Sequence, residues 1–281
     1  MRTPAPVFAP PAGLSSVGSS LAALSVAAVA VAALALSPHA RADELVVGAN
    51  VGNVPWQFQD DGGDIVGFEI DLVNAVADEL GHTVTVENIP FNGLFSAVQS
   101  GRIDIATSSI TITDERLESV SFAQPYYDSD QSLTARSDSG IASLDDLDGK
   151  VIGVDTGSTG DMWASDNAEQ YGFGEIRRYE GLSPAMLDLA AGRIDGYISD
   201  IPALLYYTKD KPELDVVQRI ETGEKYSMMF AKDAELAAEV NEALTTLKES
   251  GTVAELHEKW FGSAPEASTS TVTVLDMPST K

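Results

Sequence analysis

The sequence contains no cysteine, and this absence excludes disulfide bonds, a thiolate nucleophile and any metal site built on cysteine ligands. It also excludes a bacterial lipid anchor, because such an anchor is attached to a cysteine. Histidine is scarce, since only His82 and His257 follow the first 42 residues. Both are expected at exposed helix ends rather than as catalytic bases. We therefore expect neither a metal ion nor a cofactor.

Basic residues are also few, with 17 lysines and arginines against 43 aspartates and glutamates and a formal net charge of −26. Nucleic acids and anionic membrane surfaces both require a basic protein face, so neither is an expected partner. A solvated acidic surface accounts for this composition more simply than an acidic docking face does.

A long apolar run lies near the N-terminus, over residues 21–36. Its 16 residues are short for a membrane span, which needs about 20. Residues 38–42 follow it with the small-x-small pattern of a secretory cleavage site. We expect residues 1–42 to be a signal peptide that is cleaved after Ala42, which places the mature chain in the periplasm. An uncleaved anchor is the alternative.

Beyond residue 42, short strand-like runs alternate with helical periodicity, a pattern typical of parallel sheets flanked by helices. The strands are expected at residues 45–49, 83–86, 103–105, 150–154, 176–179, 194–198 and 226–231. The helices are expected at residues 68–80, 93–99, 160–171, 184–191, 201–207, 235–249 and 253–260. Two phrases, residues 95–104 and 186–195, both place a helix before Gly-Arg-Ile-Asp and a strand. The fold class is therefore α/β, with two lobes of similar build.

The polar segment Ser-Ile-Thr-Ile-Thr-Asp-Glu-Arg at residues 109–116 directly follows one expected strand. It brings hydroxyl groups, backbone N–H groups and one arginine to the end of that strand. A planar guanidinium binds a carboxylate through two hydrogen bonds, and peptide N–H groups can complete the shell. The segment favours a carboxylate site at Arg116. A surface turn in which Thr113 caps a short helix is the other reading.

Two more strand ends carry polar side chains. Gly157-Ser158-Thr159 precedes a helix, where exposed N–H groups attract an anion, although simple capping is equally compatible. No Gly-Lys-Ser/Thr follows, which argues against a nucleotide triphosphate. Asp200 stands at the next strand end and can take an ammonium group, or it can act as a helix N-cap before Pro202.

Arg116, Thr159 and Asp200 are all expected beyond the carboxyl ends of strands, where ligands of α/β sheets bind. Together they offer one site for an anion and one for a cation, which matches the two ends of a free amino acid. Residues 60–64, Asp-Asp-Gly-Gly-Asp, resemble part of a calcium loop, but the closing glutamate is missing. A polar hairpin is expected there.

The run Gly-Phe-Glu-Ile-Asp-Leu at residues 67–72 resembles the signature of the bacterial extracellular solute-binding proteins of family 3. Four further segments resemble that family in the same order: residues 109–116, 125–127, 157–159 and 259–262. The resemblance runs from about residue 45 to residue 262. It implies a type II periplasmic-binding-protein fold, in which two hinge strands join two lobes and the ligand binds in the cleft between them.

The resemblance also implies a division of the mature chain. Lobe 1 is expected over residues 43–127 and 228–262, lobe 2 over residues 132–223, and the hinges over residues 128–131 and 224–227. Residues 263–281 are rich in serine, threonine, proline and alanine without helical periodicity, and they are expected to form a disordered tail.

In proteins of this family, the position of Arg116 holds the α-carboxylate of the ligand, with help from the N–H groups of Thr111 and Thr159. The position of Asp200 holds the α-ammonium group, together with the Thr111 hydroxyl and the Ser109 carbonyl. The resemblance therefore implies the same roles for these five residues.

The expected side-chain pocket departs from the family pattern. Phe91 matches an aromatic residue that lies along the ligand, but Asn53 stands where many members have a stacking aromatic and Asn50 where many have aspartate. Asp155 occupies a position that varies with the ligand, and Trp56 is expected in the core. An acidic residue beside two asparagines favours a polar or cationic ligand side chain.

These observations predict a monomeric receptor that captures a free amino acid by lobe closure and delivers it to the permease of an ABC importer. One alternative is a secreted dehydratase of the same fold that acts on prephenate or arogenate. The pairing of Arg116 with Asp200 argues against it, since prephenate has no ammonium group. Another alternative is a sensory ligand-binding module, which would need a separate membrane partner.

Overall fold

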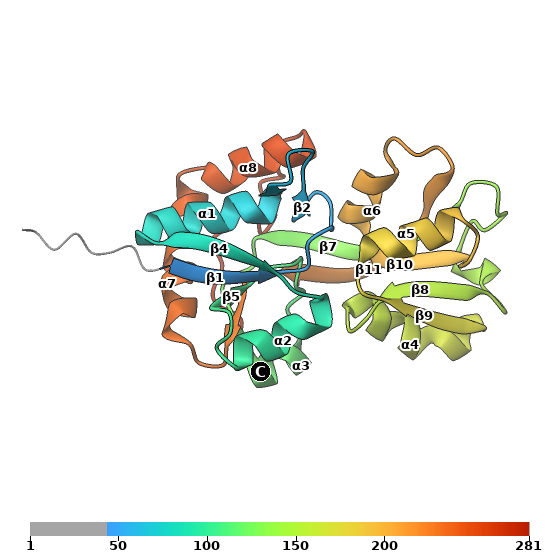
Figure 1. The fold of residues 1–281 in the computed structure, drawn as a ribbon, viewed down its shortest axis with the longest axis horizontal. Coiled ribbons are helices and arrows are strands. Elements are labelled where there is room, and N and C mark those ends of the chain that lie inside the picture. Colours follow the sequence, from blue (N-terminus) through green and yellow to red (C-terminus); the bar gives the residue numbers. More distant parts are fainter. Residues whose placement is uncertain (1–43, 281) are drawn as a thin grey trace, which may run out of the picture. The chain divides into compact units, whose positions relative to one another are not determined.

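The computed structural model describes residues 44–280, which contain two five-stranded sheets and eight α-helices (Figure 1). None of the helices in this part of the chain is long and apolar enough to cross a membrane. The expected signal peptide and its cleavage site lie outside the described residues. The α/β class and the two-lobe fold expected from the sequence are confirmed.

The first sheet has the strand order β4-β1-β5-β12-β6. Its strands are β1 (Glu44–Ala49), β4 (Thr83–Asn88), β5 (Ile105–Ala106), β6 (Val120–Phe122) and β12 (Met229–Ala231). β1 runs parallel to β4 and β5, whereas β12 is antiparallel to β5 and β6. The helices of this lobe are α1 (Phe68–Leu80), α2 (Phe91–Gln99), α3 (Asp114–Ser119), α7 (Glu235–Glu249) and α8 (Thr252–Phe261).

The second sheet has the order β11-β7-β10-β8-β9. Its strands are β7 (Tyr127–Arg136), β8 (Val151–Asp155), β9 (Glu175–Tyr179), β10 (Gly196–Asp200) and β11 (Leu214–Tyr226). β8 is parallel to β9 and β10, and β7 is antiparallel to β10 and β11. The helices α4 (Thr159–Tyr171), α5 (Leu182–Ala190) and α6 (Ile201–Thr208) belong to this lobe.

Two long strands carry the chain between the sheets. β7 leaves the first lobe after β6, and β11 returns antiparallel to it, with Tyr127 opposite Tyr226 at the crossing. The single strand expected over residues 226–231 is wrong, because β11 ends at Tyr226 and β12 begins at Met229. The break falls at Ser227, whose hydroxyl donates to the Ala123 carbonyl and whose N–H donates to the Ile110 carbonyl.

Helix α1 has the bounds that the periodicity predicted, and its core-facing side chains include Phe68, Leu72 and Val76. Gly81 ends it in the left-handed conformation, which glycine adopts without strain. Gly67 precedes it with φ 142°, and a Cβ there would lie 2.1 Å from the Trp56 carbonyl oxygen. The signature glycine is therefore required by a close backbone approach.

The repeated Gly-Arg-Ile-Asp phrases occupy equivalent places in the two lobes. The Asp104 carboxylate accepts from the Val46 N–H at 2.8 Å, and the Asp195 carboxylate accepts from the Val151 N–H at 2.9 Å. In both lobes the same aspartate also donates its own N–H to the carbonyl of that strand residue. The repeated aspartate thus ties the start of the following strand to β1 in one lobe and to β8 in the other.

An aromatic cluster packs at the crossing of the long strands. The Trp56 ring is fully buried, as expected for a core residue, and lies edge-on to Tyr127 at 4.7 Å and to Tyr226 at 5.4 Å between centroids. The expectation that His257 lies at an exposed helix end is wrong. This residue lies inside α8 and stacks on Tyr127 at 5.7 Å. His82 follows the Gly81 cap of α1, at a helix end as expected, but it is half-buried and not exposed.

Residues 263–280 contain no helix or strand, but they differ from the disordered tail that their composition predicted. Ser270 is 1% exposed and donates to the Asp128 carboxylate from its N–H at 2.7 Å and its hydroxyl at 2.6 Å. The buried Lys248 ammonium donates to the Thr273 carbonyl at 2.9 Å. Composition misses this packing because it rests on polar groups that meet charged partners, not on apolar periodicity.

Candidate ligand-binding cleft

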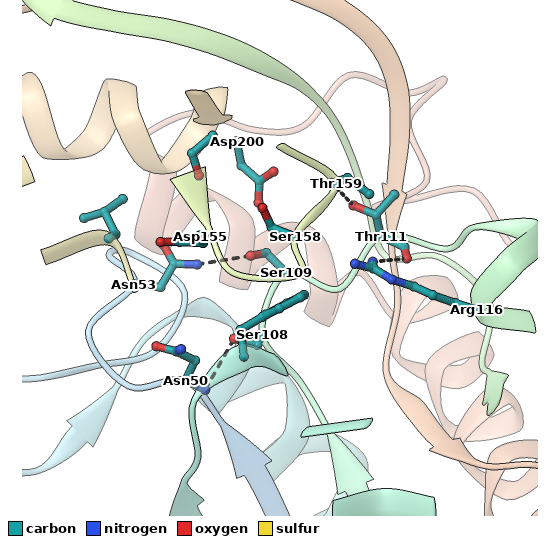
Figure 2. A pocket seen from close by; sticks show the side chains of 13 residues that line it. Asn50, Asn53, Ser108, Ser109, Thr111, Arg116, Asp155, Ser158, Thr159 and Asp200 are labelled. Atoms are coloured by element: carbon teal, nitrogen blue, oxygen red, sulfur yellow. Dashed lines mark hydrogen bonds between the residues drawn. The ribbon is translucent and has the colours of Figure 1, made fainter. Parts of the chain in front are cut away.

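A small pocket lies where the carboxyl ends of β1, β8 and β10 meet the segment after β5 (Figure 2). Its cavity of about 30 Å³ has room for one or two water molecules. Residues of both lobes line it: Asn50, Asn53, Phe91, Ser108, Ser109, Thr111, Arg116, Asp155, Ser158, Thr159, Leu182, Ser199 and Asp200. All nine residues singled out in the sequence are in this set, and their roles toward a ligand stay predictions.

Arg116 is held in the pocket wall by contacts with both lobes. Its guanidinium donates to the Thr111 carbonyl at 2.7 Å and to the Gly157 carbonyl of the other lobe at 3.2 Å. Its Cζ lies 5.5 Å from the Phe91 ring centroid and 5.1 Å from that of Phe95. Burial lowers the pKa of Arg116 to about 10, against the opposing effect of nearby carboxylates, so the side chain is still a cation at neutral pH.

The segment at residues 109–116 contains the expected helix cap, and its Arg116 is buried in the pocket wall, while the carboxylate site stays a prediction. Thr113 is the N-cap of α3, and its hydroxyl accepts from the Arg116 N–H at 3.1 Å. The cap fixes the first turn of this six-residue helix, and Arg116 projects from that turn into the pocket. Capping and site formation are therefore parts of the same local structure.

Ser109 has a left-handed backbone, with φ 45°, which is rare for residues other than glycine. Its N–H donates to the buried Glu69 carboxylate at 2.7 Å, and the Tyr126 hydroxyl donates to the same oxygen. Burial raises the pKa of Glu69 to about 7 despite these hydrogen bonds. Helix α1, which carries the family signature, thus supplies the Glu69 carboxylate that holds the left-handed Ser109 backbone in place.

The two asparagines join the same wall. The Asn53 amide donates to the Ser109 hydroxyl at 3.1 Å, and the Gln57 amide donates to the Ser108 hydroxyl at 2.8 Å. Asn50 reaches the other lobe, where its side-chain amide donates to the Glu180 carbonyl at 3.2 Å.

Asp200 is half-buried at the start of α6, but its side chain does not cap the helix. It accepts instead from the Gln131 amide at 2.6 Å. Burial, and then the negative charge of Glu224, raise the pKa of Asp200. A ligand ammonium group at this place would stabilise the ionised carboxylate and so offset the cost of burying its charge.

Two residues that the sequence reasoning missed complete the network, Gln131 and Glu224. The Gln131 amide donates to Glu224 at 3.0 Å as well as to Asp200. Glu224 accepts from the Thr111 hydroxyl at 2.7 Å and the Thr159 hydroxyl at 3.1 Å. Both lie within the expected hinge segments, but nothing in the sequence separates Glu224 from the many solvated acidic residues.

Asp155 lies at the other end of the pocket from Arg116 (Figure 2). Its Oδ1 atom is buried and has no hydrogen-bond partner within residues 44–280. Burial raises the pKa of Asp155 to about 7 against the opposing effect of the Tyr197 hydroxyl, and the charge of Glu180 adds a smaller increase. An unpaired buried carboxylate favours a cationic partner.

The carboxylates around the pocket outnumber its cations. Asp155, Asp200 and Glu224 face one buried arginine, Arg116. Within the described residues no group of three histidine, aspartate or glutamate side chains is placed to hold a metal ion. The arrangement can take a molecule with one carboxylate near Arg116 and positive charge elsewhere.

Comparison with known proteins agrees with this geometry. A family model for bacterial extracellular solute-binding proteins, family 3, matches residues 45–263. The arginine-binding extracellular protein ArtP of Bacillus subtilis is 32% identical over 221 residues, covering 78% of this chain and 86% of that protein. The L-cystine-binding protein TcyJ of Escherichia coli K12 is 32% identical over 226 residues, covering 78% and 82%.

A solved structure extends the likeness to three dimensions. The arginine-, lysine-, histidine-binding protein ArtJ of Geobacillus stearothermophilus superposes with a TM-score of 0.75 at 34% identity, covering 80% of this chain and 98% of that one. The fold is thus shared over most of this chain and nearly all of that one. The chain belongs to the bacterial extracellular solute-binding proteins of family 3.

Proposed function

We propose that this protein is the periplasmic receptor of an ABC importer, which captures a free amino acid by lobe closure and delivers it to the permease. The observation that carries the proposal is the placement of Arg116 and Asp200, which come from different lobes and line one pocket. One is a cation and the other an acid, so the pocket offers opposite charges to the two ends of an amino acid. The relatives named above bind amino acids according to their names.

Ligand binding proceeds by closure of the lobes on the amino acid. Arg116 and the N–H groups of Thr111 and Thr159 take the α-carboxylate, and Asp200 takes the α-ammonium group together with the Thr111 hydroxyl and the Ser109 carbonyl. Each lobe therefore holds part of the same ligand, and the ligand stabilises the closed arrangement. The affinity includes the free energy of closing, because only the closed state makes both sets of contacts.

The ligand side chain points toward Asp155, Asn50 and Asn53, with Phe91 along its length. The unpaired Asp155 carboxylate favours a cationic side chain, and the asparagines accommodate a polar one. Two of the relatives bind arginine according to their names, which supports a cationic ligand.

The division into lobes and the cellular location belong to the same proposal. The hinges lie at residues 128–131 and 224–227, near the crossing of β7 with β11, and lobe 1 is discontinuous. Residues 1–42 are a signal peptide cleaved after Ala42, and the mature chain acts in the periplasm as a monomer without catalysing a reaction.

Calorimetric titration of the mature protein with the twenty amino acids tests the proposal. We expect saturable binding of one ligand per chain, tightest for amino acids with a cationic side chain. Binding of none of them would overturn it. Turnover of prephenate or arogenate by the same preparation would favour the dehydratase, and binding only in the presence of a membrane kinase partner would favour the sensory module.

A further inference from the structure

Glu224 contacts residues of both lobes at the cleft, although it does not itself line the pocket. It lies near the end of β11 and is 7% exposed. One carboxylate oxygen accepts from the Thr111 hydroxyl of lobe 1 at 2.7 Å and from the Thr159 hydroxyl of lobe 2 at 3.1 Å. A single acidic group thereby touches the two threonines from which the amino-acid backbone is expected to receive its contacts.

The direction of these hydrogen bonds has a chemical consequence. A hydroxyl group carries one proton and two lone pairs, so a hydroxyl that donates to a carboxylate can only accept from any further partner. The two hydroxyl oxygens are 3.4 Å apart, and both Thr111 and Thr159 line the pocket. With Glu224 taking their protons, both hydroxyls can offer only lone pairs, and one lone pair of Thr159 already accepts from the Gln131 amide at 3.3 Å. Lone pairs suit an ammonium group and not a carboxylate.

The second carboxylate oxygen of Glu224 is linked through Gln131 to Asp200, the acid expected to bind the ligand ammonium group. The Gln131 amide nitrogen lies 3.0 Å from Glu224 and 2.6 Å from Asp200, so it joins the two carboxylates. The titratable side chains near Glu224 on the packed elements include Asp200 on β10 and Arg116 on α3, whose pKa values its charge affects. The acid is therefore placed to act on the ammonium end of the site as a unit with Asp200.

We propose that Glu224 is a positioning residue that orients the hydroxyls of Thr111 and Thr159 as acceptors and thereby makes binding depend on the ligand's α-ammonium group. The inference rests on the proposed function and extends it. Glu224 acts through the two threonines and adds negative charge behind them. It explains why an acid is buried beneath a site whose other acids already outnumber its arginine.

The test uses Glu224→Gln, which keeps the shape of the side chain but lets its amide donate to one of the hydroxyls. Glu221→Gln is the matched control, because Glu221 is an exposed acid on the same strand. The ligands are L-arginine and 5-guanidinopentanoic acid, which is the same molecule without the α-ammonium group. Thermal melting shows first that each variant folds.

We expect Glu224→Gln to weaken the binding of L-arginine roughly ten- to a hundredfold, which is the range for loss of a hydrogen bond to a charged group. The affinity for the desamino acid should change by less than about threefold. Glu221→Gln should leave both ligands unchanged. In a Thr111→Val background the loss caused by Glu224→Gln should be several-fold smaller, because the hydroxyl it orients is gone. If Glu224 only stabilised the fold, Glu224→Gln would weaken the binding of both ligands alike. It would also cause the same loss of affinity in the wild-type and Thr111→Val backgrounds.

Three results would overturn the inference: unchanged binding of L-arginine by Glu224→Gln, equal losses for both ligands, or an equal loss when Thr111 is valine. If the wild type binds another amino acid instead of arginine, that amino acid and its desamino acid replace the pair. If the wild type binds none of the twenty, the proposed function fails and the inference fails with it, which distinguishes the two failures.

Discussion

The two ends of the cleft differ in how their polar groups are satisfied. At the end proposed to bind the amino-acid backbone, Arg116, Thr111, Thr159 and Asp200 are joined to partners in a continuous network of hydrogen bonds. At the side-chain end, Asp155 has a buried carboxylate oxygen without any partner among the described residues. At the first end most polar groups are already paired, although the Gln131 Oε1 atom also lacks a partner in this part of the chain, whereas at the second end the missing partner is a carboxylate's, which we propose the ligand supplies.

This difference indicates how one fold serves several ligands. A preorganised network binds a group that all α-amino acids share, and its groups need little rearrangement when the ligand arrives. An unsatisfied carboxylate is costly by itself and rewards a ligand that brings the missing positive charge. Specificity is therefore expected to change at Asp155 while the backbone end stays the same.

The largest loss is expected for Arg116→Ala at the preassembled end. Removing one partner of a buried charge pair costs about 2–5 kcal/mol, which is more than tenfold in affinity. Calorimetry should show this loss for every amino acid that the wild type binds. Arg102→Ala, which removes an exposed arginine paired with Glu87, is the control and should bind normally. Equal affinities of Arg116→Ala and the wild type would disprove the carboxylate assignment.

Asp200→Asn should follow, with a loss of about tenfold or more for amino acids, because the amide gives the ligand ammonium no charge partner. Ligands that lack the amine should be nearly unaffected. Competition binding with an amino acid and its desamino acid measures both. If the two ligands weaken to the same extent, Asp200 does not hold the ammonium group.

Asp155→Asn should change selectivity and not general affinity. The affinity for L-arginine should fall roughly tenfold, since the ligand loses one charged hydrogen-bond partner. The affinity for its uncharged analogue L-citrulline should change little. The ratio of the two dissociation constants is the readout. A uniform loss for both ligands would place Asp155 outside the side-chain end.

Lower pH should weaken arginine binding several-fold between pH 8 and pH 6. Burial raises the pKa of Asp155 to about 7, so the unliganded carboxyl takes up a proton as the pH falls through that value. A guanidinium prefers the ionised carboxylate, so binding must release this proton and becomes weaker in acid. Titrations across this range should show the slope in the wild type and a smaller slope in Asp155→Asn. Affinity that rises in acid would contradict the sign.

The smallest effect on binding is expected for removal of residues 264–281, which touch neither end of the pocket. The buried Lys248 then loses its bond to the Thr273 carbonyl, and Asp128 loses those from Ser270. The melting temperature should fall by a few degrees, at about 2–4 °C per kcal/mol for a domain of this size. An affinity for L-arginine that changed more than about threefold would show that the tail affects the cleft.

Much of this molecule could be predicted from its sequence, because the relevant signals are local. Helix α1 and its glycine ends, the hairpin of β2 (Phe58–Gln59) with β3 (Ile65–Val66), and the alternation of strands and helices all follow from short patterns. The nine candidate site residues could be predicted because they stand at strand ends or match family segments. The structure brings all of them to one pocket.

The residues that were missed depend on contacts between distant parts of the chain. Glu224 contacts Thr111 across 113 positions, and Gln131 contacts Asp200 across 69. Ser270 is buried by its bonds to Asp128, 142 positions earlier. Each is a polar residue whose sequence surroundings look solvent-exposed, so only the folded arrangement reveals that it is buried and paired.

The most direct test of the account is calorimetric titration of the mature wild-type protein with L-arginine, L-citrulline and 5-guanidinopentanoic acid at pH 8. The three ligands differ only in the groups that the two ends of the cleft are proposed to recognise. We predict that L-arginine binds one to one and that each of the other two is weaker by at least about tenfold, since each lacks one charge-assisted contact. Equal affinities for the three, or no binding of L-arginine, would contradict the account.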